Sequence, residues 1–384
     1  MRRLHLLGCL ALVFCSGLIF TNEAAAYPQF IAKGYTNCAS CHYAPDGGAM
    51  ANAYGVATQQ AFLPDGVGVE FIDELRDTLS KNLVMGYDDD DNPAFQWDVG
   101  FDSRFLLLMA SAQVGSNDDF IFIPMLIEPQ LAMAYGPVTV YGSVSSRKNG
   151  AERKDMTAFS RHHWVQYRMD DELSLRAGRM TQPFGIRHAD HTVYTRRDLG
   201  FDKYDQTYGL QVDWNTENWS VAAMGFAGNY LVGAPEVQER GLSATVAYQW
   251  TGRATVGLSL LGGMSELSQR LATGVFTRAK LWGHSYVMAE VDTQLRKATG
   301  GDSSQVDLMG ILRLGWYPWE WLDVYTETGF KMVAGASDLT RVSAIVGAAW
   351  KILPWMEIGP YLRVLHSPDG GTQFQIIDQL HIVY

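Results

Sequence analysis

Residues 286–296 read Tyr286-Val287-Met288-Ala289-Glu290-Val291-Asp292-Thr293-Gln294-Leu295-Arg296. Aliphatic side chains at 287, 289, 291 and 295 alternate with a second set that carries two carboxylates, an amide and a guanidinium. This period of two predicts a β-strand whose faces meet different surroundings. Charged groups at successive positions of one face exclude a dry sandwich core, because unpaired buried charges are costly. Lipid on one side and a wet lumen on the other accommodate both faces, so the stretch predicts a strand of a transmembrane β-barrel.

The same alternation recurs throughout residues 94–384, for example over residues 95–105 and 242–250. Turn-forming sequences separate these stretches, namely Gly115-Ser116-Asn117-Asp118, Gly136-Pro137, Asp170-Asp171, Asn215-Thr216-Glu217, Thr251-Gly252, Trp282-Gly283 and Trp316-Tyr317-Pro318. We therefore predict a mainly β protein, a transmembrane antiparallel β-barrel of about 16 strands, an even number as in bacterial outer-membrane barrels. A soluble all-β protein is the alternative.

Aromatic residues and the end of the sequence favour the barrel. The chain has 11 Trp and 18 Tyr, many near predicted strand ends, where outer-membrane barrels carry aromatic girdles. In the last predicted strand the apolar residues share one parity, interrupted by Asp378 alone; they are Phe374, Ile376, Leu380, Ile382 and Tyr384. An aromatic residue ending such a strand resembles the assembly signature of bacterial barrels.

Residues 1–26 have the three regions of a secretory signal peptide. Arg2 and Arg3 precede an apolar run over residues 4–20, and Ala24-Ala25-Ala26 provides a small-residue cleavage site. A membrane anchor is the alternative, but the run is short for a span and no stop-transfer charges follow. The formal net charge is −11, and loss of the signal makes it one unit more negative. This acidic balance argues against a nucleic-acid partner, because phosphate binding relies on Lys and Arg.

The motif Cys38-Ala39-Ser40-Cys41-His42 follows the signal. Its C-x-x-C-H spacing allows Cys38 and Cys41 to form thioethers with one haem while His42 binds the iron, so we predict one covalently bound haem c. Two other cysteines leave with the signal, so no disulfide scaffold is expected. A thioredoxin-like pair, half of a zinc site and chance are the alternatives; a zinc site needs two further soft ligands, and a thioredoxin motif needs a βαβ surround.

The haem motif belongs to a predicted small N-terminal unit, residues 27–86, of mostly helical or irregular structure. An amphipathic helix is expected over residues 70–82. Met50 and Met85 are candidate distal ligands of the haem iron, with Met50 equally suited to packing and a lumen histidine as a further possibility. Residues 87–93 contain Asp88-Asp89-Asp90-Asp91 and read as an acidic linker, since they lack the spacing of a calcium loop. The barrel then covers residues 94–384.

A second region of interest is residues 179–191, where Pro183 and Gly185 interrupt the strand pattern among arginines and histidines. It admits three interpretations: a solvated loop, a constriction of the lumen, or a metal site. On the preceding predicted strand, one of His162 and His163 faces the lumen in either register.

The N-terminal motifs Pro28-x-Phe30, Cys38-Ala39-Ser40-Cys41-His42 and Asn52-Ala53-Tyr54-Gly55, followed by the long β pattern, carry a resemblance. With them the chain resembles the fused monohaem cytochrome–porins of iron-oxidising bacteria and their relatives. The resemblance implies an outer-membrane conduit that exchanges electrons between an extracellular partner, notably ferrous iron, and a periplasmic carrier. It implies nothing about the direction of flow.

Three functional hypotheses follow. In the first, the chain sits in outer-membrane lipid as an electron conduit, with its haem unit on the periplasmic side or inside the lumen, because both chain termini of an even-stranded barrel lie on the periplasmic side. In the second, it is a small-solute porin with a haem-containing plug. In the third, it is a haem peroxidase or sensor with an open iron position.

Overall fold

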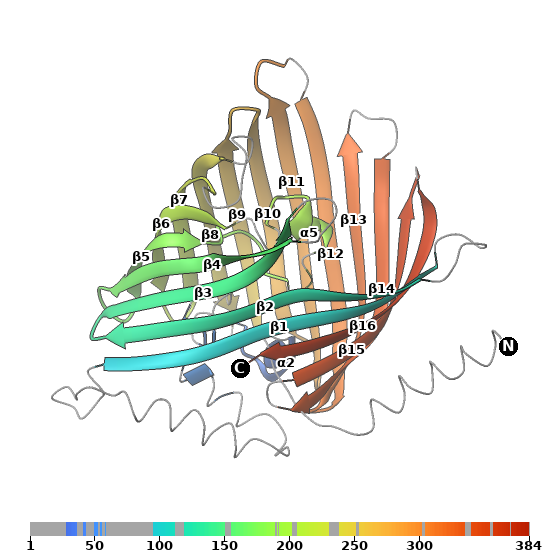
Figure 1. Cartoon of the computed structure of the whole chain (residues 1–384), viewed down its shortest axis with the longest axis horizontal. Helices are drawn as coiled ribbons and strands as arrows, with labels where there is room; N and C mark the ends of the chain where they lie inside the picture. The colour runs from blue at the N-terminus through green and yellow to red at the C-terminus, as the bar shows by residue number, and fades with distance from the viewer. Residues whose placement is uncertain are drawn as a thin grey trace.

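The computed structural model describes residues 28–36, 41–43, 50–52, 54–55, 58, 95–111, 119–149, 155–188, 190, 192–201, 206–229, 238–250, 253–301, 304–334, 339–353, 356–368 and 370–383. Sixteen antiparallel strands form a closed barrel in which each strand pairs with its sequence neighbours and β1 pairs with β16 (Figure 1). The predicted fold class is confirmed. Among the described residues, no helix has the length and apolar character needed to cross a membrane.

The strands are β1 (Phe95–Ser111), β2 (Asp119–Tyr135), β3 (Val138–Asn149), β4 (Asp155–Arg168), β5 (Leu173–Met180), β6 (Thr207–Asn215), β7 (Trp219–Ala227), β8 (Arg240–Trp250), β9 (Ala254–Met264), β10 (Ser268–Lys280), β11 (Ser285–Ala298), β12 (Ser304–Trp319), β13 (Leu322–Ala334), β14 (Leu339–Leu353), β15 (Met356–Ser367) and β16 (Gly371–Val383). The short helices α2 (Pro28–Lys33) and α5 (Tyr194–Arg197) lie apart from the wall.

The two sets of alternating residues in 286–296 lie on the two faces of the barrel wall. In β11, Val291 is 48% exposed on the outer face, whereas Asp292 and Gln294 are fully buried on the inner face. Outward aliphatic residues such as Leu242 and Leu258 remain exposed for the same reason: lipid is their solvent. The inner face holds the polar and charged residues.

The two ends of the barrel differ. At one end, which we call the short-turn end, brief turns such as Gly136-Pro137 join successive strands. At the other, the loop end, β5 and β6 are joined by residues 181–206. The first residue of β1 and the last residue of β16 both lie at the short-turn end, because Phe95 pairs with Tyr135 and Val383 pairs with Asp102.

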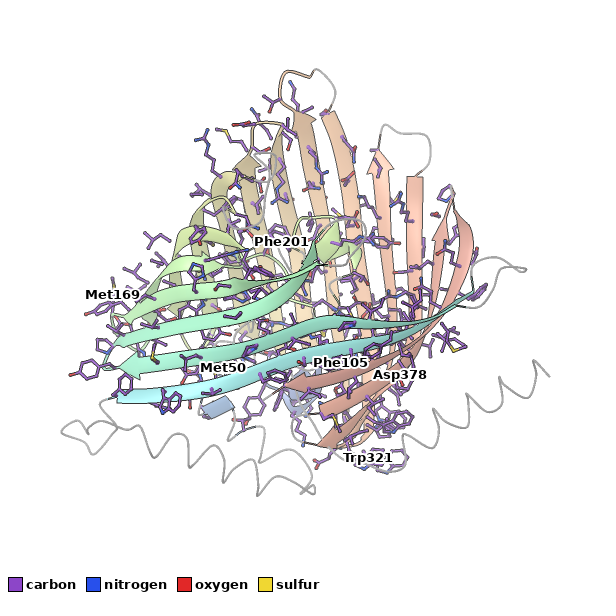
Figure 2. The ribbon with its side chains drawn as sticks, in the orientation of Figure 1. Met50, Phe105, Met169, Phe201, Trp321 and Asp378 are labelled. Carbon is purple, nitrogen blue, oxygen red and sulfur yellow. The ribbon has the colours of Figure 1, made fainter. Side chains whose placement is uncertain are left out.

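Exposed aromatic residues gather at the short-turn end, one of the two ends at which the sequence predicts a girdle. Trp321 lies at this edge of the barrel in Figure 2. The exposed aromatic side chains next to these turns are Tyr135, Tyr167, Trp214, Trp219, Tyr248, Trp250, Trp282, Trp316, Trp319 and Trp321. Indole and phenol rings favour the boundary between hydrocarbon and headgroups, so this ring marks one membrane interface.

One predicted turn is displaced. Trp316-Tyr317-Pro318 belongs to β12, and the chain reverses after Trp319 instead. The register of β12 against β13 shifts between Trp316 and Trp319. Proline has no amide hydrogen for the ladder, so Pro318 is accommodated at this irregularity rather than in a turn.

Several predicted segments lie outside the described residues. They are the signal peptide over residues 1–26, the amphipathic helix over residues 70–82, the acidic linker over residues 87–93 and the terminal Tyr384.

Candidate functional site in the barrel lumen

Cys41 and His42, the two members of the haem motif that the structure describes, lie in a short antiparallel ladder. His42 and Ala51 form a β-bridge, and the amide of Asn52 donates to the Cys41 carbonyl at 2.9 Å. Both side chains of the motif are partly buried. Residues 37–40, including Cys38, lie outside the described part of the chain.

The residues that follow the motif close tightly on Cys41. A Cβ atom on Gly55 would lie 2.1 Å from the Cys41 carbonyl oxygen, so only glycine fits here. The Asn52 carboxamide oxygen accepts the Gly55 amide at 2.9 Å and fixes this approach. Burial, followed by the neighbouring Tyr54, raises the pKa of Tyr35, with a smaller contribution from Cys41. The Asn52–Gly55 motif is therefore a structural clamp on the haem motif's backbone.

The opposite face of the ladder rests on the inner wall of the barrel. The Tyr43 amide donates to the Met50 carbonyl at 3.2 Å, and both side chains pack against a buried apolar cluster in the lumen. The Tyr43 hydroxyl donates to Asp98, a buried residue on the inner face of β1. Side chains alternate across a ladder, so Met50 and His42 point to opposite faces. Met50 is placed as a packing residue; its role as an iron ligand stays a prediction, and Met85 lies outside the described residues.

Helix α2 occupies the short-turn end of the lumen, where it lies against β10, β11 and β12 (Figure 1). Lys33 forms an ion pair of 2.7 Å with Glu320, in the turn between β12 and β13. Ile31 and Ala32 join a second buried cluster, whose other members are Ile186, Ala247, Phe276, Tyr286, Met288 and Tyr317. Tyr286 and Met288 face the lumen, so the N-terminal segment lies inside the barrel wall.

Cys41 and His42, the described members of the motif, are of the residue types that bind a covalent haem. Such a group takes two thiols and an adjacent imidazole from one short segment. Cys41 and His42 supply one thiol and the imidazole on an anchored ladder, and His42 lies on the face turned away from the apolar cluster. Among the described residues, no group of three or more His, Cys, Asp and Glu side chains gathers to hold a metal ion.

The connection over residues 181–206, which we call the inner loop, folds into the lumen at the residues that the structure describes, 181–188, 190, 192–201 and 206. The Ile186 amide donates to Glu290 on β11 at 2.9 Å, and His188 contacts Glu327 on β13 at 3.1 Å. A Cβ on Gly185, which has φ +56°, would collide with the Glu290 carboxylate, so the turn needs glycine. Further anchors on the facing wall are Gly185 to Ser259, Asp190 to Arg363, Asp198 to Lys331, and Leu199 to Arg270.

The inner loop and the wall enclose the first apolar cluster. Its buried members are Ala132, Tyr141, Trp164, Met180, Tyr194, Leu199, Phe201, Met224, Phe226, Leu261, Ala272 and Met309. The rings of Tyr141 and Trp164 stack with centroids 4.9 Å apart, and those of Phe184 and Phe201 with centroids 5.1 Å apart. In Figure 2, Met50 lies nearer the short-turn end than Phe201. The cluster thus joins the haem-motif segment to the inner loop.

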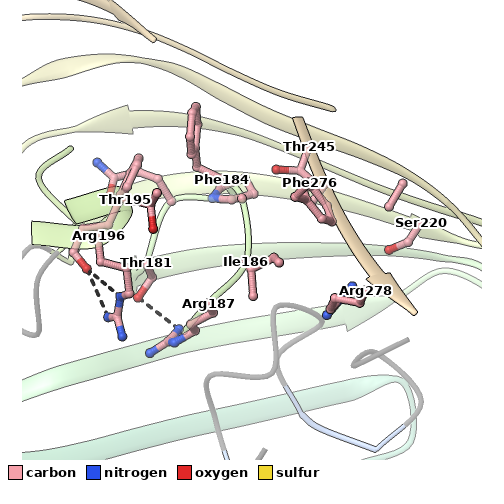
Figure 3. Close-up of a pocket in the computed structure, with 16 residues that line it drawn as sticks. Thr181, Phe184, Ile186, Arg187, Thr195, Arg196, Ser220, Thr245, Phe276 and Arg278 are labelled. Atoms are coloured by element: carbon pink, nitrogen blue, oxygen red, sulfur yellow. Dashed lines mark hydrogen bonds between the residues drawn. The ribbon is translucent and has the colours of Figure 1, made fainter. Parts of the chain in front are cut away.

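A cavity of about 820 Å³, counting its opening to solvent, lies beside the inner loop (Figure 3). Arg187 and Arg278 contribute guanidinium groups to it, and the Arg187 guanidinium donates to Thr181 at 3.2 Å. Phe184 and Phe276 form its apolar side. Of the three interpretations of residues 179–191, the geometry favours a constriction, because this segment is held across the lumen by charged partners.

A bulge in β4 decides the orientation of the neighbouring histidines. The register between β3 and β4 shifts so that Arg161 and His162 both lie opposite Ser143 on the inner face. Both contact Glu128, with His162 at 3.5 Å. His163 instead packs its ring against Tyr208, with centroids 5.3 Å apart. One histidine of the pair faces the lumen as predicted, but strict alternation could not show that Arg161 accompanies it.

The sequence does not predict that the inner loop continues inside the lumen beyond His188. The only signals were the length of this connection and its density of arginines. The His188 ring contacts Glu327 through Nε2 and accepts the Asp190 amide at Nδ1, and His191 lies outside the described residues.

No protein-family model matches this chain, and no curated protein matches it in sequence. Solved structures do match in fold. OmpT of Vibrio cholerae has a TM-score of 0.60 at 8% identity, covering 78% of this chain and 100% of that one. An anion-selective porin from Comamonas acidovorans has a TM-score of 0.62 at 11% identity, covering 76% and 100%. The outer-membrane channel DcaP of Acinetobacter baumannii has a TM-score of 0.57 at 10% identity, covering 79% and 100%. The chain therefore has the barrel fold of outer-membrane porins.

Proposed function

We propose that this chain is a monohaem c-type cytochrome fused to a porin-like barrel, and that it passes single electrons across the bacterial outer membrane. The observation that carries the proposal is the position of Cys41-His42. These residues lie on a segment docked, through Tyr43 and Asp98, on the inner face of the barrel. A motif suited to covalent haem is thus held on the path through the membrane.

In this proposal Cys38 and Cys41 attach one haem c and His42 binds its iron. A bound haem supplies one-electron chemistry. The chain's own residues hold the segment and exclude water beside it: Gly55 and Asn52 fix the Cys41 backbone, while Tyr43 and Met50 pack on the apolar cluster. Low polarity around a haem is one of the means by which a protein sets its potential.

The surroundings of the barrel belong to the same proposal. The aliphatic outer face and the aromatic ring fit outer-membrane lipid. Because short turns of bacterial barrels face the periplasm, the proposal has the haem-motif segment meet a periplasmic electron carrier at the short-turn end. The extracellular partner, a donor or an acceptor, then approaches from the loop end; ferrous iron is one such donor.

The test is electron transfer in proteoliposomes. The full chain is reconstituted in vesicles that enclose an electron acceptor, and a membrane-impermeant donor is added outside. We expect acceptor reduction with the wild type and none with the Cys38→Ala/Cys41→Ala variant, both checked for barrel folding by heat-modifiable gel mobility. Covalent haem staining of the denatured wild type comes first. Absence of the stain, or equal transfer by the variant, would overturn the proposal.

A second candidate is a small-solute porin in which the N-terminal segment is a plug. The inner loop favours this candidate, because it extends from the barrel wall into the lumen and narrows it. The guanidinium groups of Arg187, in the loop, and Arg278, on β10, line a cavity beside it. Liposome swelling separates the two functions: a porin admits sugars and small ions at a rate that does not depend on haem, whereas a conduit transfers electrons with little swelling.

A further inference from the structure

A second cavity lies on the loop-end side of the inner loop. It has a volume of about 750 Å³, counting its opening to solvent, and lies between α5 and the inner faces of β13 to β16. Arg197 comes from α5, Arg341 from β14 and Arg363 from β15. Four strands far from α5 in sequence, β13 to β16, therefore build this space together with the inner loop.

Positive charge is in excess here. Glu327 is the acidic residue of the lining, and it already contacts His188 at 3.1 Å and Arg313 at 3.7 Å. Arg363 pairs with Asp190. The cavity therefore retains the charge of Arg341 in a chain whose net charge is −11.

Arg341 is the informative residue. It lies directly across from Lys331 in the β13–β14 register, on the same inner face. Like charges opposite each other destabilise a sheet unless a counter-charge intervenes. Lys331 has Asp198 at 2.9 Å, whereas within the described part of the chain the Arg341 side chain makes no hydrogen bond or ion pair. Arg197 pairs with Asp198 at 3.0 Å and keeps 45% of its side chain exposed.

Neutral donors complete the lining. The Ser367 oxygen accepts the Gly370 amide at 3.0 Å, which leaves its hydroxyl hydrogen to donate inward. Gln373 lines the cavity from the inner face of β16, whereas the Ser343 hydroxyl, on the inner face of β14, donates to the Gly329 carbonyl at 3.5 Å. Guanidinium forks and hydroxyl groups around one space match the oxygens of carboxylate and phosphate groups.

We propose that this cavity binds a small, multiply charged oxyanion, a polycarboxylate or a phosphate, between Arg197 and Arg341. Binding of the anion itself does not require the haem. When the anion is bound together with a metal ion that it chelates, the metal–anion complex is the class of compound expected as the extracellular redox partner. This extension rests on the proposed function.

Calorimetric titration of the full-length, detergent-solubilised protein with citrate, and separately with inorganic phosphate, tests the proposal. Arg341→Gln is expected to weaken binding about tenfold, the loss of one charge-assisted contact, and Arg197→Gln/Arg341→Gln to abolish it. Arg253→Gln removes an exposed guanidinium at the short-turn end and is the matched control, expected to bind like the wild type.

The outcomes separate the anion sources and the two proposals. Tighter binding of citrate identifies a polycarboxylate site, and tighter binding of phosphate identifies a phosphate site. No binding of either anion by the wild type, or equal binding by the double variant, would overturn the inference. Electron transfer is measured on the same preparations: arginine-dependent binding without haem-dependent transfer would refute the conduit and leave the anion site standing.

Discussion

The Tyr43 hydroxyl donates a hydrogen bond to Asp98, so a residue adjacent to the haem motif is tied to the inner face of the first strand of the barrel. The two residues are 55 positions apart. The contact is possible only from inside the lumen, because Asp98 lies on the buried face of β1.

Removing this hydrogen bond should loosen the haem-motif segment and leave the barrel intact. Tyr43→Phe deletes a bond to a charged acceptor, of the kind worth about 1.5–3 kcal/mol. We expect faster proteolytic release of the N-terminal segment from the folded barrel, followed on gels without heating. Tyr167→Phe, at an exposed position near a turn, is the control. Equal cleavage of the two variants would show that the bond does not hold the segment.

Gly55→Ala should impair haem attachment. The new methyl group would press on the Cys41 carbonyl oxygen, which lies 2.1 Å from the site of that Cβ, so the motif's backbone must shift. The readout is the ratio of covalent haem to protein in a pyridine haemochrome assay. Gly262→Ala is the matched control, since nothing lies within 4 Å of the Cβ added there. A full complement of haem in Gly55→Ala would contradict the clamp.

Substitutions of Met50 distinguish a packing role of this side chain from iron ligation. Because its side chain packs on the lumen cluster, on the ladder face opposite His42, we expect Met50→Leu to keep the visible spectrum and reduction potential of the wild type. Met50→Ala should cost about 2–5 kcal/mol of stability, as large-to-small core changes do. A fall in potential or a high-spin spectrum in Met50→Leu would instead establish Met50 as the distal ligand.

The inner loop should control passage of solutes. Asp198→Asn removes the charge that pairs with Lys331 at 2.9 Å and weakens the hold of the loop on the far wall. We expect a higher single-channel conductance and faster liposome swelling than the wild type, because the loop no longer stays in place. Asp170→Asn, in the turn between β4 and β5, leaves the lumen unaltered and serves as the control. Unchanged conductance in Asp198→Asn would argue that other anchors suffice.

The outer face should tolerate no charge. Leu258→Arg, at a residue 62% exposed to lipid in the middle of β9, is expected to destabilise the barrel by about 2–4 kcal/mol. Gln249→Arg, on the inner face of β8, places the same side chain toward the wet lumen and should cost much less. Urea unfolding in lipid vesicles measures both. Equal losses would contradict the assignment of the two faces.

The sequence by itself determined the wall of this protein. A period of two fixes which residues face lipid, because a strand offers only two faces and each solvent selects its own residues. Residues 242–250 and 286–296 were read correctly for this reason. Local patterns were less informative where a strand is irregular: Pro318 signalled a turn but lies in a register shift of β12, and the β4 bulge brought Arg161 to the same face as His162.

Only the tertiary structure decided what fills the lumen. The haem motif and the inner loop could be located in the sequence, but their partners could not, since Tyr43 meets Asp98 and His188 meets Glu327 across large sequence separations. Such contacts depend on which strands closure of the barrel places opposite one another, a property of the whole ring of sixteen strands rather than of any one segment. The arginines of the loop-end cavity come together for the same reason.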